Sequence, residues 1–283
     1  MVWPLRSLRS LRVTSVPLTA HRLPLTVEDM EIIRSPRVTL LARPQFVEPA
    51  HLPVSWNGPS TDGERLAEFA GRLCYMSQRN PAHRTTAEYL ENILKQGHGS
   101  VFEHSVYVLL LEGISRSCTH ELVRHRAGFG YSQLSQRYVD ESHAAFVVPP
   151  AILGDAALEA AWQKQVEAAQ AAYVAAVEEL MQRYSDIESA VHRRKVAREA
   201  ARSVLPNGTE TKIVVSGNVR AWRTMLELRL GEGAELEIRR LAVMVLRTLQ
   251  QEAPALFGDF EIYRTAEGSE RSEEHTSELQ SPI

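Results

Sequence analysis

Three arginines and one histidine surround a glycine-containing turn in residues 124–138, which read RHRAGFGYSQLSQRY. Arg124, Arg126 and Arg137 each offer a planar fork of N–H donors that matches phosphate or carboxylate oxygens. Gln133 and the neighbouring serines supply short polar groups that can read the edge of a heterocycle by hydrogen bonding. An isolated Arg-His-Arg is more often a solvated basic loop. Arginines that can bind phosphates lie here beside polar side chains that can bind a nucleobase. The stretch as a whole therefore predicts a nucleotide site.

The whole stretch resembles the signature of the flavin-dependent thymidylate synthases. That signature is an Arg-His-Arg followed by seven residues, a serine, one further residue and an Arg-Tyr pair. Ser135, Arg137 and Tyr138 fill the last places, but eight residues rather than seven separate Arg126 from Ser135. We expect the extra residue to lie within Ala127 to Gly130, because loops that contain glycine absorb insertions.

Other segments match the same family in the same order along the chain. Arg202 lies in an Ala-Arg-x-Val-Leu-Pro segment, and residues 217–220 read Gly-Asn-x-Arg. Ser100 follows a His-Gly pair, as in a family segment that lies against the flavin. Thr224 and Gly233 depart from the pattern, since the family often has a histidine or another amide-bearing or ring side chain there. The resemblance spans residues 38–263.

The resemblance implies a reaction, its cofactor and its participants. It implies conversion of dUMP to dTMP, with methylenetetrahydrofolate as carbon donor, NADPH as hydride donor and FAD as the flavin. It also implies a homotetramer whose sites are built between subunits. Arg229 matches the arginine that stabilises negative charge on the uracil, and is therefore the catalytic candidate.

The same resemblance assigns the binding residues. The implied substrate contacts are Glu121, Leu122, Val123, Arg124, Gln133, Leu134, Ser135, Gln136, Arg137, Arg202 and Arg229. The implied flavin contacts are Ser100, Arg124, His125, Arg126, Gln133, Asn218, Val219, Arg220 and Thr224. Because a strand delivers Asn218 to a helix start, we also expect free backbone N–H groups at that point.

Other functions would use the same residues differently. A nucleic-acid-binding module should be basic overall, whereas this chain carries a net charge of −3 and has a pI near 6.4. A FAD-binding relative without synthase activity stays open, given the inserted residue and Gly233. Ser135 as a covalent nucleophile would need an adjacent base, and His125 is ten residues away in sequence. Cys118 is the only plausible thiol nucleophile.

Periodicity predicts the secondary structure that positions these residues. Apolar residues at helical spacing predict helices over residues 61–76, 85–94, 114–123, 155–184, 187–205, 219–230 and 236–252. Strand patterns predict strands over residues 38–41, 106–111, 146–150 and 211–215. Cys74 falls in an amphipathic helix and is expected to be a small core residue. The irregular alternation predicts one α+β domain with a mixed or antiparallel sheet covered by several helices.

Composition predicts that both ends lie outside the fold. Residues 1–25 hold four arginines and no acid, so we expect residues 1–29 to be an extension before a start at Met30, although transit peptides share this composition. Residues 271–283 resemble a translated sequencing adaptor, which leaves residues 30–270 as the domain. Two cysteines without zinc-ligand spacing, and no apolar run of about 18 residues, predict a cytoplasmic protein with no metal and no membrane span.

Overall fold

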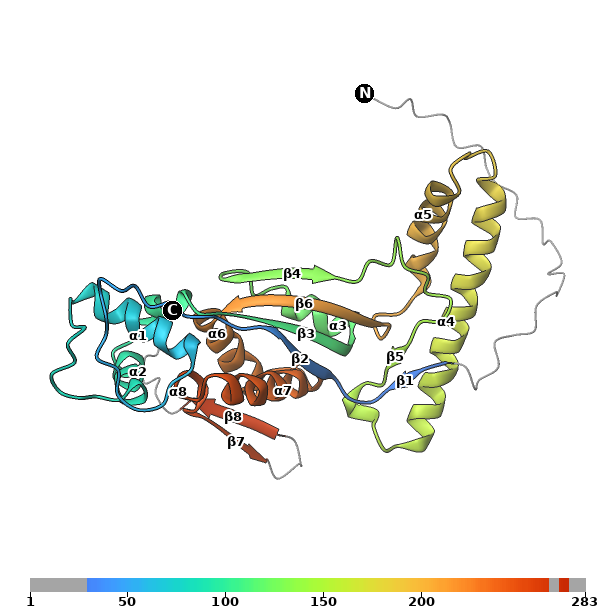
Figure 1. Ribbon diagram of the computed structural model, residues 1–283. Helices are drawn as coiled ribbons and strands as arrows, with labels where there is room; N and C mark the ends of the chain where they lie inside the picture. Colours follow the sequence, from blue (N-terminus) through green and yellow to red (C-terminus); the bar gives the residue numbers. More distant parts are fainter. Residues whose placement is uncertain (1–29, 265–269, 275–283) are drawn as a thin grey trace.

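The computed structural model describes residues 30–264 and 270–274 (Figure 1). Its strands are β1 (Ile32–Ile33), β2 (Arg37–Ala42), β3 (Val106–Ser115), β4 (Phe129–Gln133), β5 (Phe146–Val147), β6 (Glu210–Asn218), β7 (Phe260–Arg264) and β8 (Glu270–Glu274). Its α-helices are α1 (Asp62–Cys74), α2 (Thr86–Lys95), α3 (Arg116–Leu122), α4 (Ala156–Arg183), α5 (Ala190–Ala201), α6 (Val219–Leu230), α7 (Leu236–Glu252) and α8 (Pro254–Phe257). Three 3-10 turns are η2 (Gly99–Glu103), η3 (Pro150–Ile152) and η4 (Arg202–Val204).

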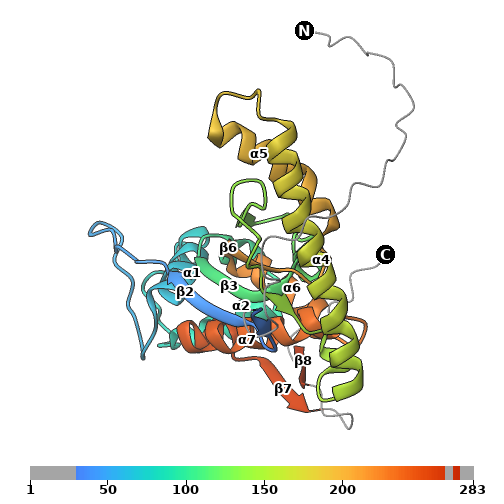
Figure 2. The ribbon, with the colours of Figure 1, turned by 90° about the vertical axis from the view of Figure 1, so that its right-hand side faces the viewer.

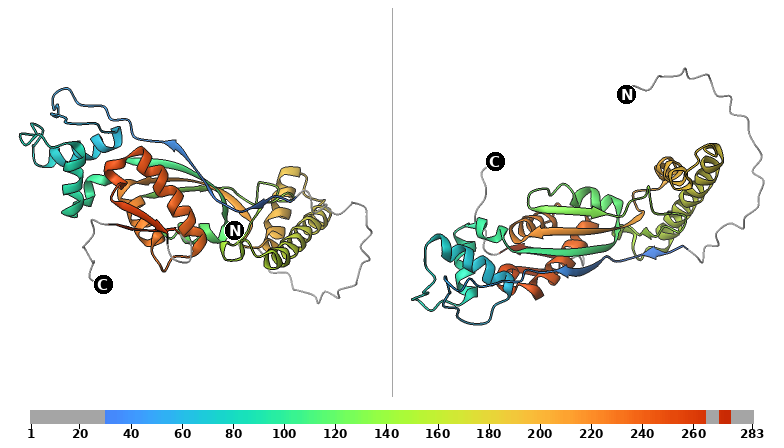
Figure 3. Two further views of the ribbon diagram at one scale, coloured as in Figure 1. Left: turned by 90° about the horizontal axis from the view of Figure 1, so that it is seen from below. Right: turned by 45° about the horizontal axis from the view of Figure 1, so that its top comes forward.

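A four-stranded sheet of order β2-β3-β6-β4 forms the centre of the fold, and each neighbouring pair is antiparallel. Helices α6 and α7 cover one of its faces (Figures 1 and 3). Helices α1 and α2 lie at one end of the sheet, and α4 and α5 form an arm at the other (Figures 1 and 2). With the parallel β1–β5 pair and the β7–β8 hairpin, this is the predicted α+β fold with mixed sheets.

The core lies between the sheet and helices α6 and α7. Alternate residues of β3 are fully buried, among them Leu109 and Leu111, because successive side chains of a strand point to opposite faces. Trp222 of α6 is also fully buried and meets the Phe129 ring edge-on, with 4.9 Å between ring centroids. This contact fixes the start of β4 on the start of α6.

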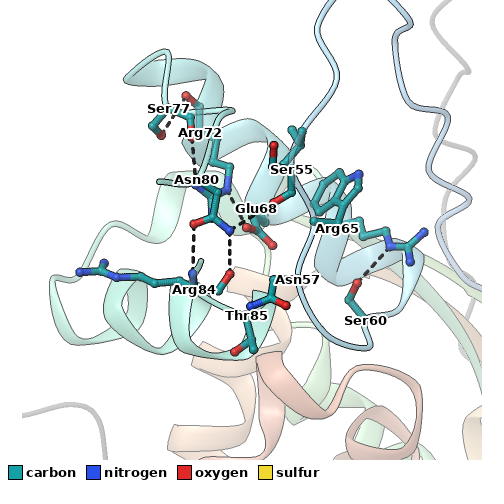
Figure 4. Close-up of polar contacts among 12 residues, drawn as sticks. Ser55, Asn57, Ser60, Arg65, Glu68, Arg72, Ser77, Asn80, Arg84 and Thr85 are labelled. Atoms are coloured by element: carbon teal, nitrogen blue, oxygen red, sulfur yellow. Dashed lines mark hydrogen bonds and ion pairs between the residues drawn. The ribbon is translucent and has the colours of Figure 1, made fainter. Parts of the chain in front are cut away.

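Capping residues set the helix boundaries. Thr61 and Thr85 begin α1 and α2 with reciprocal capping boxes, each with a glutamate three residues later. Asn80, whose φ is 45°, orders the loop between these helices. Figure 4 shows its polar contacts. The Asn80 amide donates to the carbonyl oxygens of Ser55 and Arg84 and accepts from the Arg84 N–H. The loop is therefore held by polar contacts rather than by apolar packing.

Several sequence predictions differ from the structure. The predicted helix over residues 114–123 starts only at Arg116, because Ile114 and Ser115 continue β3. The predicted helix over residues 187–205 is shorter in the structure, where α5 covers Ala190–Ala201 and the 3-10 turn η4 follows it over Arg202–Val204. Strand β4 lies where the sequence predicted a turn. Cys74 is exposed, so its placement in the core was wrong.

The helices α4, α6 and α7 match their predicted ranges to within one residue. Asp155 and Asn218 cap the first two of them by accepting backbone N–H bonds. None of the helices within the described residues is long and apolar enough to cross a membrane. The expected extension over residues 1–29 lies outside the described residues, and β8 includes residues of the expected adaptor-derived tail.

Candidate functional site

A pocket of about 510 Å³ lies where the turn before β4 meets the start of α6. Five residues predicted to contact flavin lie around it: His125, Arg126, Asn218, Arg220 and Thr224. Gly128 and Phe129 also line the pocket. Two arginines beside an aromatic ring suit a planar heterocycle that carries phosphates. The residues present therefore fit a flavin nucleotide.

The helix start contributes less free backbone than the sequence predicted. The Asn218 side chain accepts the Ala221 N–H, at 2.8 Å, as an N-cap. The Val219 N–H donates to the Ser105 carbonyl, at 2.9 Å, and the Val219 side chain is fully buried. Val219 thus offers a ligand neither its N–H nor its side chain, and the expectation of free N–H groups at this point was wrong for Val219 and Ala221.

Gly128 shapes the floor of this pocket. Its φ is 77°, in the left-handed region that favours glycine, and its carbonyl accepts the Asn218 N–H. A Cβ at Gly128 would lie 2.8 Å from the Asn218 side-chain nitrogen and 2.9 Å from the Ala221 Cβ. The turn can therefore approach α6 this closely only because residue 128 has no side chain.

We expect Gly128→Ala to weaken flavin binding at least about ten-fold while the chain stays folded. A non-glycine residue at positive φ costs of order 1–3 kcal/mol, and the clash with Ala221 adds to this cost. Flavin titration by fluorescence quenching measures the effect. Gly154→Ala is the matched control, because Gly154 also has a positive φ, of 90°, but a Cβ added there would meet nothing within 4 Å. Equal flavin affinity in both variants would contradict the role of Gly128.

Ser100 lies in a second pocket, of about 380 Å³, together with His98, Gly99 and Cys74. Arg220 borders both pockets and forms an ion pair with Glu103, at 2.6 Å. The Arg220 side chain thus lies between the two pockets. Ser100 and Arg220 therefore lie close enough to contact different parts of one extended ligand.

Arg229, near the end of α6, is held by two residues from the predicted site. Its Nε donates to the His125 Nε2, at 2.9 Å, and its guanidinium forms an ion pair with Glu121, at 2.7 Å. Partial burial, and then the charge of Arg229, lower the pKa of His125 below its ordinary value. His125 is thus neutral when it accepts this bond, and Arg229 is fixed as the positive charge beside the first pocket.

Two further acids lie at the start of α7, in the segment that follows Arg229. Glu237 is buried and accepts the backbone N–H and the hydroxyl of Ser115, both at 2.7 Å. Glu235 is exposed along much of its length, but partial desolvation of its carboxyl and a hydrogen bond to Glu121 raise its pKa to about 7. Below about pH 7, Glu235 therefore keeps a proton in its hydrogen bond with Glu121.

The raised pKa of Glu235 gives a pH-dependent stability. Between pH 4.5 and about 7 the folded protein keeps this proton while the unfolded chain releases it, so stability falls as pH rises through this window. We expect Glu235→Gln to remove this contribution, so that its Tm relative to the unmodified protein is higher at pH 8 than at pH 5. Thermal melts at both values measure the difference. A constant Tm difference would contradict the shared proton.

The other predicted substrate contacts lie at the far end of β4. Gln133 donates to the hydroxyls of Thr119 and Thr211, at 3.1 and 3.2 Å. Arg137 forms an ion pair with Glu199 of α5. The remaining members of this group are Leu134, Ser135, Gln136 and, after α5, Arg202. Gln136 is buried, and its side-chain nitrogen has no partner within the described residues.

Arg116 joins this second group, although sequence reasoning missed it. It is the first residue of α3, and it donates to the Thr211 hydroxyl at 3.3 Å and the Leu134 carbonyl at 3.5 Å. Burial lowers the pKa of Arg116 below its ordinary value, and the charge of Arg202 adds to this effect, while the carboxylate of Glu141 opposes it. Two arginines that repel each other in a partly buried place suit an anion. The only sequence signal was an arginine one short helix before the signature.

The structure therefore divides the predicted site residues into two groups. In the first group, His125 and Arg126 precede β4, and Arg229 is bonded to His125. In the second group, Ser135, Gln136 and Arg202 lie beyond the other end of β4. Five residues of extended strand separate these groups by about 13 Å. Of the remaining predictions, Leu122 is fully buried, Val123 is half-buried and Arg124 is exposed, so Leu122 has no side chain to offer a substrate.

The surroundings of Cys118 do not favour a nucleophilic thiolate. Cys118 is fully buried, and burial, followed by nearby glutamates, raises its thiol pKa well above the ordinary value. A thiol that stays protonated is a poor nucleophile. Residues 30–264 and 270–274 contain no group of three or more histidine, cysteine or acidic side chains that could hold a metal ion.

Comparisons with known proteins support one family. The sequence profile of the family described as Thymidylate synthase complementing protein matches residues 59–255. A protein of Mycobacteroides abscessus, named Flavin-dependent thymidylate synthase, is 49% identical over 236 residues, which cover 83% of this chain and 93% of that protein. A protein of the same name from Mycobacterium sp. (strain JLS) is 51% identical over 240 residues, with the same coverage. The chain therefore belongs to the flavin-dependent thymidylate synthase family.

Proposed function

We propose that the protein converts dUMP to dTMP, with FAD held in the pocket between Gly128 and the start of α6. The position of Arg229, fixed by Glu121 and His125 at the edge of that pocket, is the observation that carries the proposal. A bound flavin would supply the redox chemistry and the carbon transfer. The chain itself must bind and orient the reactants and stabilise charge on the uracil.

Arg126 and Arg220 would neutralise the phosphates of FAD, and Phe129 would contact the apolar part of the ligand. Asn218 already uses its side-chain oxygen as a helix cap, so only its amide nitrogen remains to donate to a ligand. Thr224 donates its hydroxyl to the Arg220 carbonyl, so this hydroxyl can only accept a bond from a ligand without losing its own. Gly233 offers no side chain, and a Cβ there would meet open space.

Arg229 would stabilise the negative charge that develops on the uracil as the methyl group is introduced. Its guanidinium is a planar fork of N–H donors, and its two partners hold it in one orientation. A preorganised donor aimed at developing charge lowers the barrier without rearranging during the reaction. Arg116 and Arg202 would bind the phosphate of dUMP.

We further propose that a second copy of the chain completes each site, in a homotetramer. Arg229 and Arg202 are both assigned to dUMP, yet β4 separates their groups within one chain. The two groups can act on one dUMP if they come from different subunits. NADPH and methylenetetrahydrofolate are the proposed co-substrates. The free cysteines Cys74 and Cys118 favour the reducing cytoplasm as the location.

The visible spectrum of the purified protein tests the proposal. We expect a yellow protein whose flavin absorbance is bleached by NADPH, and formation of dTMP that requires dUMP and methylenetetrahydrofolate. A colourless protein that takes up no added FAD would contradict the flavin pocket. Bound flavin without turnover that depends on dUMP would instead identify a FAD-binding relative that has lost synthase activity.

A further inference from the structure

A larger pocket, of about 730 Å³, lies away from the predicted flavin and substrate contacts. Its lining residues come from α7, β7, β8, η3 and the segments beside η3 and β2. Figure 1 shows where the labelled helices and strands lie. No residue that lines it also lines the candidate flavin pocket. Its volume falls within the range of about 300–1,000 Å³ that is typical of small-molecule sites.

Arginine dominates the charge of this α7 pocket. Arg239, Arg240, Arg247, Arg264 and Arg271 line it, and Glu270 is the one acid in the lining within the described residues. Arg247 forms an exposed ion pair with Glu270, at 2.8 Å, and the two side chains remain 51% and 32% exposed. Surface pairs of this kind are weak, so a phosphate could replace Glu270 on Arg247.

Two of these arginines have their full donor sets available. Within residues 30–264 and 270–274, the side chains of Arg240 and Arg264 make no hydrogen bond or ion pair. Arg239 is buried, and its guanidinium is held by the carbonyls of Glu232 and Ala234, so it adds a fixed positive charge beneath them. Arg271 and most of β8 belong to the expected adaptor-derived tail, so the proposal rests on the part of the lining that precedes it, in which Arg239, Arg240, Arg247 and Arg264 supply the positive charge.

The rest of the lining is apolar. Leu236, Val243 and Met244 follow one face of α7, at the helical spacing that also places Arg240 and Arg247 there. Leu153 and Pro36 face them across the pocket. A space with arginine forks along one helix and apolar walls beside them suits a molecule with a charged end and an apolar or aromatic body.

We propose that this pocket binds a small phosphorylated organic molecule of the size of a nucleoside diphosphate. Two or more phosphate groups would bridge Arg240, Arg247 and Arg264, and the body would pack on Met244 and Val243. A polynucleotide is a poorer fit, because the chain as a whole is acidic.

The test is calorimetric titration of the full chain with ADP, inorganic pyrophosphate and adenosine, in excess FAD and dUMP so that other anion sites are occupied. We expect ADP to bind more tightly than either fragment, and its affinity to fall with rising salt. The double variant Arg240→Gln, Arg264→Gln should weaken ADP binding roughly ten-fold or more, because charge-assisted bonds to phosphate are lost.

Two controls separate the site from general charge effects. Arg183→Gln removes an exposed arginine at the end of α4 and should leave ADP affinity unchanged. Arg264→Lys keeps the charge and should retain most of the affinity. Equal ADP affinity in the double variant and the unmodified protein overturns the proposal. Failure of the unmodified protein to bind ADP at millimolar concentration, or binding of a polyribonucleotide alone, overturns it as well.

Discussion

Replacing Arg229 with alanine should lower the rate of dTMP formation by roughly 10²–10³, or about 3–4 kcal/mol, because a preorganised donor aimed at developing charge is lost. The flavin spectrum should be kept, since Arg229 does not line the flavin pocket and reaches it only through His125. Arg229→Lys keeps the charge but loses the fork that joins His125 and Glu121. Its rate of dTMP formation should therefore lie between the rates of the unmodified protein and of Arg229→Ala. Single-turnover assays with bound flavin measure these rates.

Cys118→Ala is the control for this experiment. A cysteine-dependent route to thymidylate would need a thiolate, and burial holds the Cys118 pKa well above its ordinary value. We therefore expect Cys118→Ala to keep its turnover, apart from a modest loss of stability because a buried atom is removed. Loss of dTMP formation in Cys118→Ala, together with full activity in Arg229→Ala, would show that the arginine mechanism is wrong.

The sequence predicted the helices better than the sheet. Helices α4 and α6 carry local signals, a capping side chain and a regular apolar period, and these signals need no distant partner. Strand β4 contains Gly130 and follows Gly128, which reads locally as a turn, and it becomes a strand only through pairing with β6, where Phe129 faces Gly217. Pairing across almost ninety residues leaves no local pattern.

The candidate site shows the same division between local and distant information. The signature predicted His125 and Arg126 as flavin contacts, and both line the same pocket. The bond between Arg229 and His125 joins residues 104 positions apart. The role of Arg116 in α3 depends on a hydrogen bond to Thr211 of β6. Such contacts depend on how the elements pack. Cys74 was misplaced for a similar reason, since an amphipathic period alone does not show whether a neighbour covers the helix end.

The division of the site by β4 leads to a prediction about assembly. Arg229→Ala and Arg202→Ala should each be nearly inactive alone, since one would lack charge stabilisation and the other a phosphate contact. If the two arginines reach one dUMP from different subunits, unfolding and refolding a mixture of the variants creates some sites that are intact on both sides. With random assortment, about one site in four should recover in an equal mixture.

The same mixture distinguishes the alternative arrangement. If Arg229 and Arg202 of one chain serve the same dUMP, every site in the mixture lacks one of them, and no activity returns. The double variant Arg229→Ala, Arg202→Ala, refolded with the unmodified protein, supplies the reference, because it shows how activity falls when both losses lie on one chain. Recovery of about a quarter of the activity, measured as dTMP formed per bound flavin, would require that two copies of this chain build each site.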